Sequence, residues 1–142
     1  MRCILKEHEK LFNAFNRFMQ IKTECRLQVV HQYNIAKFTL KQIEYLKKFD
    51  GRQYVTLSQL AEELSLSKPS ITEMVRKFIQ LDCIKKERCN HDARVYYLFL
   101  TDKGKKIARL EQIANEQFIR RMGKSLNEEE INLLIEILLK IV

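Results

Sequence analysis

The chain has 142 residues, of which 46% are apolar, so it can bury one hydrophobic core and is not a disordered chain. Only three glycines and one proline occur, which favours helices over a sandwich or barrel of many short strands. The net charge of +8 and the pI of about 9.4 point toward anionic partners. No run approaches the roughly 20 apolar residues of a membrane span, and the N-terminus lacks a signal-peptide core. We therefore expect no membrane partner and a cytoplasmic protein whose four cysteines are reduced.

Apolar residues at helical spacing predict a long first helix. Ile4, Leu11, Phe15 and Phe18 fall on one stripe, and the pattern continues toward Val29. Further apolar residues at helical spacing follow each of the N-terminal capping signals described next.

Capping boxes predict where the next helices begin, because in such a box two side chains bond orphan amides of the first turn. One box spans Thr39–Gln42 and another spans Thr56–Gln59. Ser67 is a favourable N-cap for the following helix, where Pro69 is tolerated in the first turn. Two short helices joined by about three residues, 65–67, match a helix-turn-helix. The buried stripe expected for the second of them consists of Ile71, Met74, Val75, Phe78 and Leu81.

Two apolar runs, 83–89 and 95–100, predict two strands around a turn. Thr101 is expected to cap one further helix that runs to Met122, and Asn127–Glu130 forms the last capping box before an apolar C-terminal helix. The expected fold class is therefore mainly α with a small β-hairpin wing.

The turn between the two strands, "CNHDAR" at Cys89–Arg94, allows three interpretations. Cys89, His91 and Asp92 could bind a metal only if their side chains converged, whereas a turn splays them and no second cluster completes a four-ligand site. Asn-His-Asp is also typical of a tight turn, in which Asp92 would accept backbone amides or hold the Arg94 side chain. Arg94 could then reach into a nucleic-acid groove. We predict that the segment forms a turn, that the Arg94 side chain contacts nucleic acid, and that no metal is bound.

Five segments carry a resemblance to a known family. They are "FTLKQIEYL" at 38–46, "TLSQLAEELSLSKPSITEMVRKF" at 56–78, the D-x-R of "DAR" at 92–94, "LTDKG" at 100–104 and "SLNEEEINLLIEILLKI" at 125–141. A helix-turn-helix followed by a hairpin is a winged helix, and over nearly the whole chain this arrangement resembles the MarR family of transcription regulators. The chain departs from the family at Asp82, where a Gly usually ends the recognition helix. Aspartate tolerates left-handed backbone better than most residues.

The resemblance implies one MarR-like domain over 1–142, in which 1–36 and 103–142 are dimerisation helices and 39–101 is the winged helix-turn-helix lobe. The last helix is apolar over much more than one stripe, so a small domain cannot bury it alone. The first helix, with Phe12, is its natural partner, and a homodimer is expected.

The resemblance also implies binding to a palindromic operator in double-stranded DNA. Residues near the start of the recognition helix would meet base edges, residues a turn later would meet phosphate, and the wing would probe the minor groove. Charge alone does not identify this surface, because 67–94 carries a net of +3 and 1–55 a net of +6. The implied DNA-binding residues are Lys68, Ser70, Thr72, Arg76, Lys77, Asp92 and Arg94.

The sequence indicates less about how the protein is regulated than about its fold. We expect a repressor that is relieved by a small-molecule effector or an oxidant, as the resemblance implies. His31 and Tyr33 could line the family's ligand pocket, and Cys3 near a helix start could be a redox sensor, although an incidental reduced cysteine is the commoner case.

Two alternatives remain open. "PSITEMVRK" also resembles the metal-dependent DtxR-type repressors, but about 55 residues precede the helix-turn-helix and the last helix has no His or Cys. The other alternative is a winged helix used for protein contacts without DNA. No catalytic constellation or cofactor motif is present in the sequence, so we expect neither an enzyme nor a cofactor.

Overall fold

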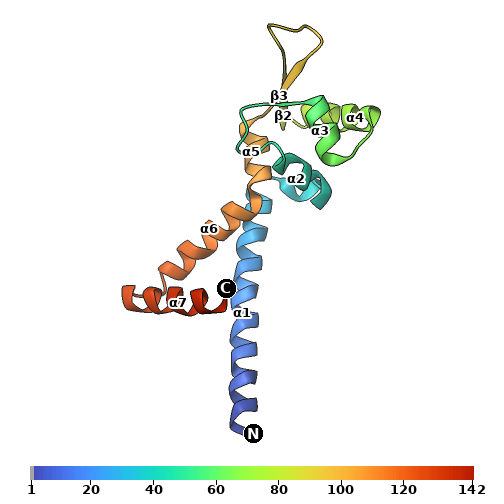
Figure 1. Cartoon of the computed structure of the whole chain (residues 1–142). Helices are drawn as coiled ribbons and strands as arrows, with labels where there is room; N and C mark the ends of the chain where they lie inside the picture. The colour runs from blue at the N-terminus through green and yellow to red at the C-terminus, as the bar shows by residue number, and fades with distance from the viewer. Residues whose placement is uncertain (1) are drawn as a thin grey trace. The chain divides into compact units, whose positions relative to one another are not determined.

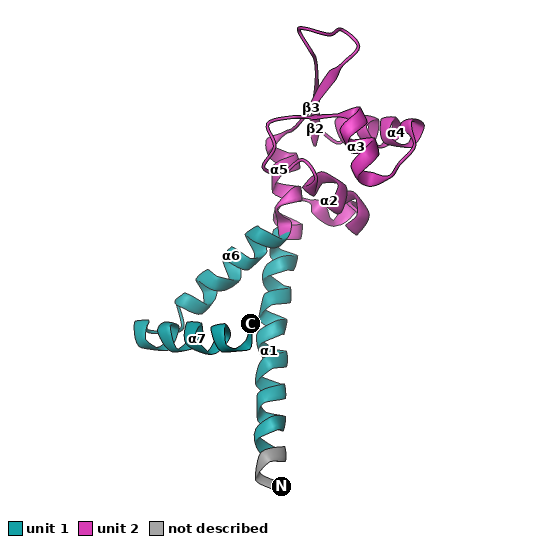
Figure 2. Cartoon of the chain, viewed as in Figure 1, with its two compact units in different colours: residues 1–29, 111–142 teal, residues 30–110 magenta. Residues whose placement is uncertain are grey.

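The computed structural model describes the backbone of residues 2–142 and the side chains from Lys6 onward. The chain is mainly helical with one small antiparallel sheet, which confirms the expected fold class (Figure 1). It divides into two compact units, residues 30–110 and residues 1–29 with 111–142 (Figure 2). Among the helices of the described residues, none is both long and apolar enough to cross a membrane.

The unit of residues 30–110 contains the helix-turn-helix and the sheet. Its hairpin extends beyond the helices α3 and α4, as Figure 1 shows. The elements in chain order are η1 (Ile35–Lys37), α2 (Leu40–Lys47), β1 (Val55–Thr56), α3 (Leu57–Leu64), α4 (Lys68–Gln80), β2 (Ile84–Arg88), β3 (Tyr96–Leu100) and α5 (Asp102–Ala108).

The capping signals place the helix starts correctly. Thr39 and Thr56 each complete a capping box, since each hydroxyl accepts from a backbone amide and each backbone amide donates to a glutamine side chain. Ser67 caps α4, with its Oγ 3.3 Å from the amide nitrogen of Ser70. Helix α3 ends at Ser65 in the left-handed conformation, so the turn between the two helices is the expected 65–67.

The sheet has three strands in the order β1-β3-β2, all antiparallel. The hairpin of β2 and β3 confirms the two predicted strands, and β1, which the sequence analysis missed, pairs Val55 with Leu98 and Thr56 with Tyr97. A strand of two residues is too short to show an alternating pattern, which explains the omission. Val55 and Leu98 are both buried, so this short strand seals one edge of the core.

The core of this unit comes from every helix and from the sheet. Its fully buried side chains are Ile35, Leu46, Val55, Leu60, Ile71, Phe78, Cys83, Leu98, Ile107 and Leu110. Of the stripe predicted for α4, Ile71, Val75 and Phe78 are buried, whereas Met74 and Leu81 are half-buried. Helix α4 therefore packs against the core through one face, and its other face is exposed.

The end of α4 is bonded to the start of α5. Thr101, the buried polar residue of the core, donates from Oγ1 to the carbonyl of Asp82 at 2.6 Å and accepts from the amide of Gly104 at 3.0 Å. The Cys83 carbonyl accepts from the Thr101 amide, and the Lys103 ammonium bonds the carbonyl of Leu81. The carbonyls of residues 81–83, left without helical partners, are satisfied in this way.

Asp82 takes the left-handed conformation expected of it, with φ 58. The amide of Cys83 donates to the carbonyl of Phe78 at 2.8 Å, as in a Schellman motif. The aspartate therefore fills the place of the usual glycine without changing the way in which the helix ends.

The second unit contains α1 (Arg2–Gln32) up to residue 29, α6 (Leu110–Gly123) from residue 111 and α7 (Glu128–Ile141). The rings of Phe18 and Phe118 meet edge to face at 4.7 Å. The ion pair Arg26–Glu111 at 2.6 Å joins α1 to α6. A long N-terminal helix and a capped C-terminal helix were both predicted, and both are confirmed.

One helix boundary was predicted wrongly. A single helix was expected from residue 102 to Met122, but Arg109 has φ −99 and ψ 17 and separates α5 from α6. Its guanidinium lies 2.7 Å from the carboxylate of Asp50, near the end of α2. Neither proline nor glycine occurs at the break, so the local sequence has no signal for it.

Much apolar surface of the second unit is exposed. No residue of α7 is buried, and Leu139 is 72% exposed. On α1, Leu11 is 69% exposed, and Phe12 and Phe15 are exposed as well. Exposed apolar side chains that lie together usually mark an interaction surface.

Gly104 allows α5 to approach the end of α4. A Cβ atom on Gly104 would lie 2.1 Å from the carbonyl oxygen of Cys83, which is backbone and cannot rotate away. Gly104→Ala should lower the free energy of unfolding by about 1–3 kcal/mol, because this clash outweighs the roughly 1 kcal/mol of helix propensity that alanine adds. The measurement is urea unfolding at one fixed protein concentration. Gly123→Ala is the control, since nothing lies within 4 Å of its Cβ position; equal losses in both variants would contradict the prediction.

The left-handed backbone at Asp82 leads to a second prediction. Asp82→Val should lower the free energy of unfolding by about 1–2 kcal/mol, because a β-branched residue is strained at this φ. Asp82→Gly should be at least as stable as the wild type, since glycine adopts the conformation freely. The same urea titration tests both variants, and a valine variant as stable as the glycine variant would show that the turn is not under this constraint.

Candidate nucleic-acid interface

The exposed face of α4 carries all five residues that were predicted on the recognition helix. Lys68, Ser70, Thr72, Arg76 and Lys77 are all exposed, while Ile71, Val75 and Phe78 hold the opposite face in the core. Three of the five are basic. The helix therefore presents polar and cationic groups outward from a rigidly packed base.

The two hydroxyls on this face are already hydrogen-bonded. Ser70 Oγ lies 2.8 Å from the Oγ of the N-cap Ser67. Thr72 Oγ1 donates to the carbonyl oxygen of Lys68 at 2.9 Å. Because each oxygen has a second lone pair, both can still accept a hydrogen bond from a ligand.

Arg76 is held by a residue that the sequence analysis did not assign to the site. Its Nε and Nη2 donate to the two carboxylate oxygens of Glu73 at 3.1 and 2.8 Å. The hydrogen bond lowers the pKa of Glu73 and raises the pKa of Arg76, so the pair is fully ionised at neutral pH. Opposite charges three residues apart on a helix were the available signal.

The helix and the hairpin form one surface beside a pocket of about 260 Å³. Lys86 of β2 lines this pocket with Thr72 and Arg76 of α4, and its ammonium lies 4.0 Å from the centre of the Tyr96 ring. The remaining lining residues are Leu57, Val75, Ile79 and Gln80. Lys86 of the wing strand and Arg76 of the recognition helix thus line the same pocket.

The wing turn closes through its own backbone. The amide of Cys89 donates to the carbonyl of Val95 at 2.9 Å, and residues 90–94 between them are exposed. Asp92 Oδ1 accepts from the backbone amide of Arg94 at 2.9 Å. Of the two roles considered for Asp92, the structure has the first, acceptance of a backbone amide. Arg94 projects from this turn into solvent.

Arg88, at the end of β2, also holds the wing. Its Nε donates to the carbonyl of Ala93 at 2.9 Å, which fixes the turn from the strand side. The sequence does not predict this role, because a flexible side chain that reaches a carbonyl five residues away leaves no pattern.

The base of the wing is formed by a thiol and two rings. Cys89 is buried, and its Sγ donates to the hydroxyl of Tyr97 at 3.2 Å. When Cys89 is ionised, the Tyr97 hydroxyl can donate to the thiolate across the same contact, which lowers the pKa of Cys89 and, with burial, raises the pKa of Tyr97 to about 12. The ring of Tyr54 packs 4.1 Å from the ring of Tyr97. The thiol is thus turned inward, whereas His91 is exposed at the tip.

The side chains of the turn therefore do not converge. From Lys6 onward, no group of three or more His, Cys, Asp or Glu side chains is arranged to hold a metal ion.

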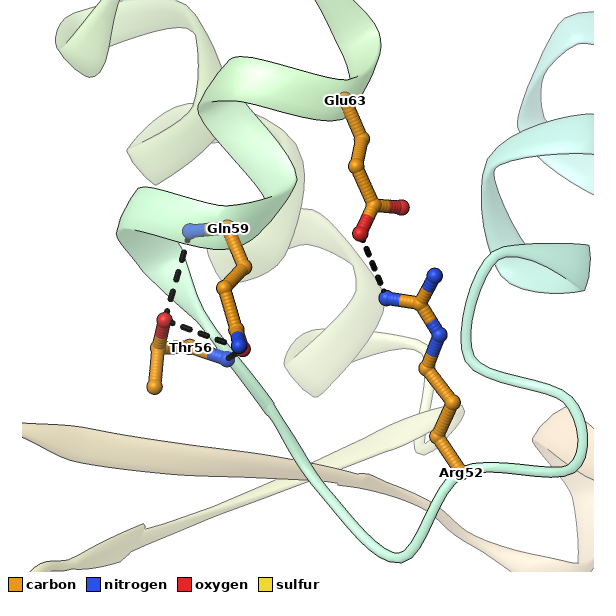
Figure 3. A network of polar contacts seen from close by, with 4 residues as sticks. All are labelled: Arg52, Thr56, Gln59 and Glu63. Carbon is orange, nitrogen blue, oxygen red and sulfur yellow. Dashed lines mark hydrogen bonds and ion pairs between the residues drawn. The ribbon is translucent and has the colours of Figure 1, made fainter.

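A polar network anchors α3 behind the interface. Figure 3 shows Arg52, in the loop before β1, whose Nη1 lies 2.6 Å from the carboxylate of Glu63 near the end of α3. At the other end of the helix, Thr56 and Gln59 close the capping box. The hydrogen bond from Arg52 lowers the pKa of Glu63. Both ends of α3 are therefore held, which steadies the helix that precedes the turn to α4.

The residues suggested for regulation are His31, Tyr33 and Cys3. His31, in the last turn of α1, is exposed. Tyr33 is half-buried, with the ammonium of Lys106 5.0 Å from its ring centre. Cys3 lies among the residues whose side chains are outside the described part of the chain.

Residues 38–96, which include the helix-turn-helix and most of the wing, match the model of the MarR family. The chain is 26% identical over 138 residues to the HTH-type transcriptional regulator MgrA of Staphylococcus aureus, covering 97% of this chain and 90% of that protein.

Solved structures of similar fold include MepR of Staphylococcus aureus bound to ethidium bromide, with a TM-score of 0.66, 19% identity and 91% of each chain covered. Another is FabT of Streptococcus pneumoniae in complex with DNA, with a TM-score of 0.55, 22% identity and coverage of 97% of this chain and 94% of that one. At these identities the structural likeness supports the fold alone, and the likeness to the MarR family rests on the sequence matches. Over residues 38–96, which include the helix-turn-helix and most of the wing, the chain matches the MarR family of transcription regulators.

Proposed function

We propose that this chain is a sequence-specific DNA-binding transcription regulator that acts as a homodimer. The observation that carries the proposal is the surface of the unit 30–110, where the exposed face of α4 and the exposed wing present basic side chains together. The relative MgrA is named a transcriptional regulator, and FabT, of the same fold, was solved in complex with DNA.

In the proposed complex, α4 enters a major groove. Lys68, Ser70 and Thr72 at its N-terminal end contact base edges, and Arg76 and Lys77 contact phosphate. The wing lies along the adjacent minor groove, into which Arg94 projects from the turn that Asp92 shapes. In a dimer, the two half-sites would lie about 10 bp apart.

The dimer would form through 1–36 and 103–142. The exposed apolar residues of α1 and α7 support this assignment, because a soluble chain rarely leaves so much apolar surface unpaired. The remaining segment, 39–101, would act as the DNA-binding lobe.

Regulation would follow from a change in the spacing of the two lobes. We infer repression by occupancy of the operator and relief by a small molecule or an oxidant. The neighbour MepR was solved with ethidium bromide bound, which supports a small-molecule effector in a protein of this fold. His31 and Tyr33 are the proposed pocket residues, and Cys3 is the proposed site for oxidation.

Binding to duplexes at several salt concentrations tests the proposal. Each neutralised phosphate releases condensed counterions, so the binding constant should fall steeply and linearly on a log–log scale as salt rises. A protein-interaction module would show no such dependence. A metal-dependent repressor would lose its binding in the presence of a chelator, and we expect no effect of chelator.

Arg94→Ala should weaken operator binding by about 1–3 kcal/mol and leave folding and dimerisation intact, because the side chain is exposed and projects from the wing. Replacement of A·T by G·C pairs beneath the wing should weaken the wild type more than this variant. The measurement is a titration of labelled operator at fixed salt. His91→Ala, an exposed residue of the same turn, is the control, and a larger loss in the control would refute the role of Arg94.

Removal of residues 127–142 should produce a monomer or an aggregate, because no residue of α7 is part of the core while its apolar side chains are available for a partner. Sedimentation or light scattering measures the result. Lys140→Gln, a change of charge on the same helix, should remain dimeric. A well-folded monomeric truncation that binds operator with full affinity would contradict the proposed interface.

A further inference from the structure

Glu73 occupies the middle of the outward face of α4. Successive residues of a helix are rotated by about 100°, so Glu73 lies about 140–160° around the axis from each of the buried residues Ile71, Val75 and Phe78. Its side chain is 66% exposed. Of the residues of α4 that face outward, Glu73 is thus among the most directly opposed to the core, and it is the anionic one.

A carboxylate at this position weakens the binding of DNA unless it makes a favourable contact with the bases. DNA phosphates line both edges of the major groove and repel an anion, whereas the floor of the groove presents base edges. A group at the centre of the inserted face is directed to the floor. Glu73 would therefore meet base edges.

The chemistry of the base edges restricts the partner of Glu73. An ionised carboxylate only accepts hydrogen bonds, and in the major groove only cytosine N4 and adenine N6 donate them. Adenine presents the acceptor N7 beside its N6 amino group, which repels a carboxylate, and guanine presents two acceptors. Cytosine has the donor without an adjacent acceptor.

We propose that Glu73 is a specificity-determining residue, whose carboxylate accepts a hydrogen bond from the N4 amino group of a cytosine in each half-site. This inference rests on the proposed DNA-binding function and adds to it a base preference and the residue that sets it.

Arg76 acts as the positioning residue for Glu73. Its Nε and Nη2 hold both carboxylate oxygens, which fixes the plane of the carboxylate before DNA is bound. Each oxygen keeps a lone pair for the cytosine amino group. The guanidinium also neutralises the carboxylate, which reduces its repulsion from the phosphates, and its Nη1 remains for the phosphate contact assigned to Arg76.

The experiment selects preferred duplexes from a randomised pool with the full-length protein. The wild type should enrich a C·G pair at one position of each half-site, and Glu73→Gln should enrich A·T there, because a glutamine amide can bond adenine N6 and N7 together. On two duplexes that differ at this pair, the wild type should bind the C·G duplex about tenfold more tightly, and the variant should reverse the order.

Glu44→Gln is the matched control. Glu44 pairs with Lys47 at 2.8 Å in the same i, i+3 arrangement and is similarly exposed, but it lies on α2. This variant removes the same charge and should retain the wild-type preference at every position.

Two results would overturn the inference. If Glu73→Gln tightens binding to all duplexes equally without changing the preferred base, the carboxylate acts only as a general repulsive charge. If the wild type enriches no C·G pair that responds to Glu73→Gln, the residue does not read DNA. Failure of the wild type to bind any duplex in a salt-dependent way would instead refute the proposed function and, with it, the inference.

Discussion

The unit of residues 30–110 depends on the hydrogen bonds of the Thr101 hydroxyl. This hydroxyl donates to the carbonyl of Asp82 at the end of α4 and accepts from the amide of Gly104 at the start of α5. It is buried, so loss of the hydroxyl would leave two backbone groups without a partner, at a cost of about 1–3 kcal/mol each. Gly104 makes the contact possible because a side chain there would collide with Cys83. These contacts fix the path of the chain where it leaves α4, and therefore where the first strand of the wing, β2, begins.

Local chemistry made most of the fold predictable. The helix starts at Thr39, Thr56, Ser67, Thr101 and Asn127 lie where their capping signals stand, because a cap acts within one turn and leaves its pattern in the sequence. The two errors arise from contacts between distant residues. The strand β1 exists because Val55 pairs with Leu98, and the break at Arg109 coincides with an ion pair to Asp50, 59 positions away. Neither contact is visible in a short window of sequence.

The candidate site was predictable only as a set of exposed residues on two elements. Once the buried stripe of α4 was assigned, the remaining residues of the helix had to form its exposed polar face. The turn at 90–94 was indicated by its composition. What the sequence did not reveal is the way in which these side chains are held. Arg76 is paired with Glu73, Arg88 bonds the carbonyl of Ala93, and Cys89 bonds Tyr97. Such contacts depend on rotamers and on register, which the pattern of residue types does not specify.

Thr56 belongs to two structures at once. Its backbone pairs with Tyr97 in the sheet, while its side chain caps α3. Tyr97 in turn receives the hydrogen bond of Cys89 at the base of the wing. A single residue thus joins the root of the wing to the first helix of the helix-turn-helix, and a displacement of β3 that pulled on Thr56 would also disturb the cap of α3. The wing and the helix-turn-helix are therefore mechanically coupled, so the angle between them is a fixed property of the unit, and a DNA groove that accepted both elements, as proposed, would have to match that angle.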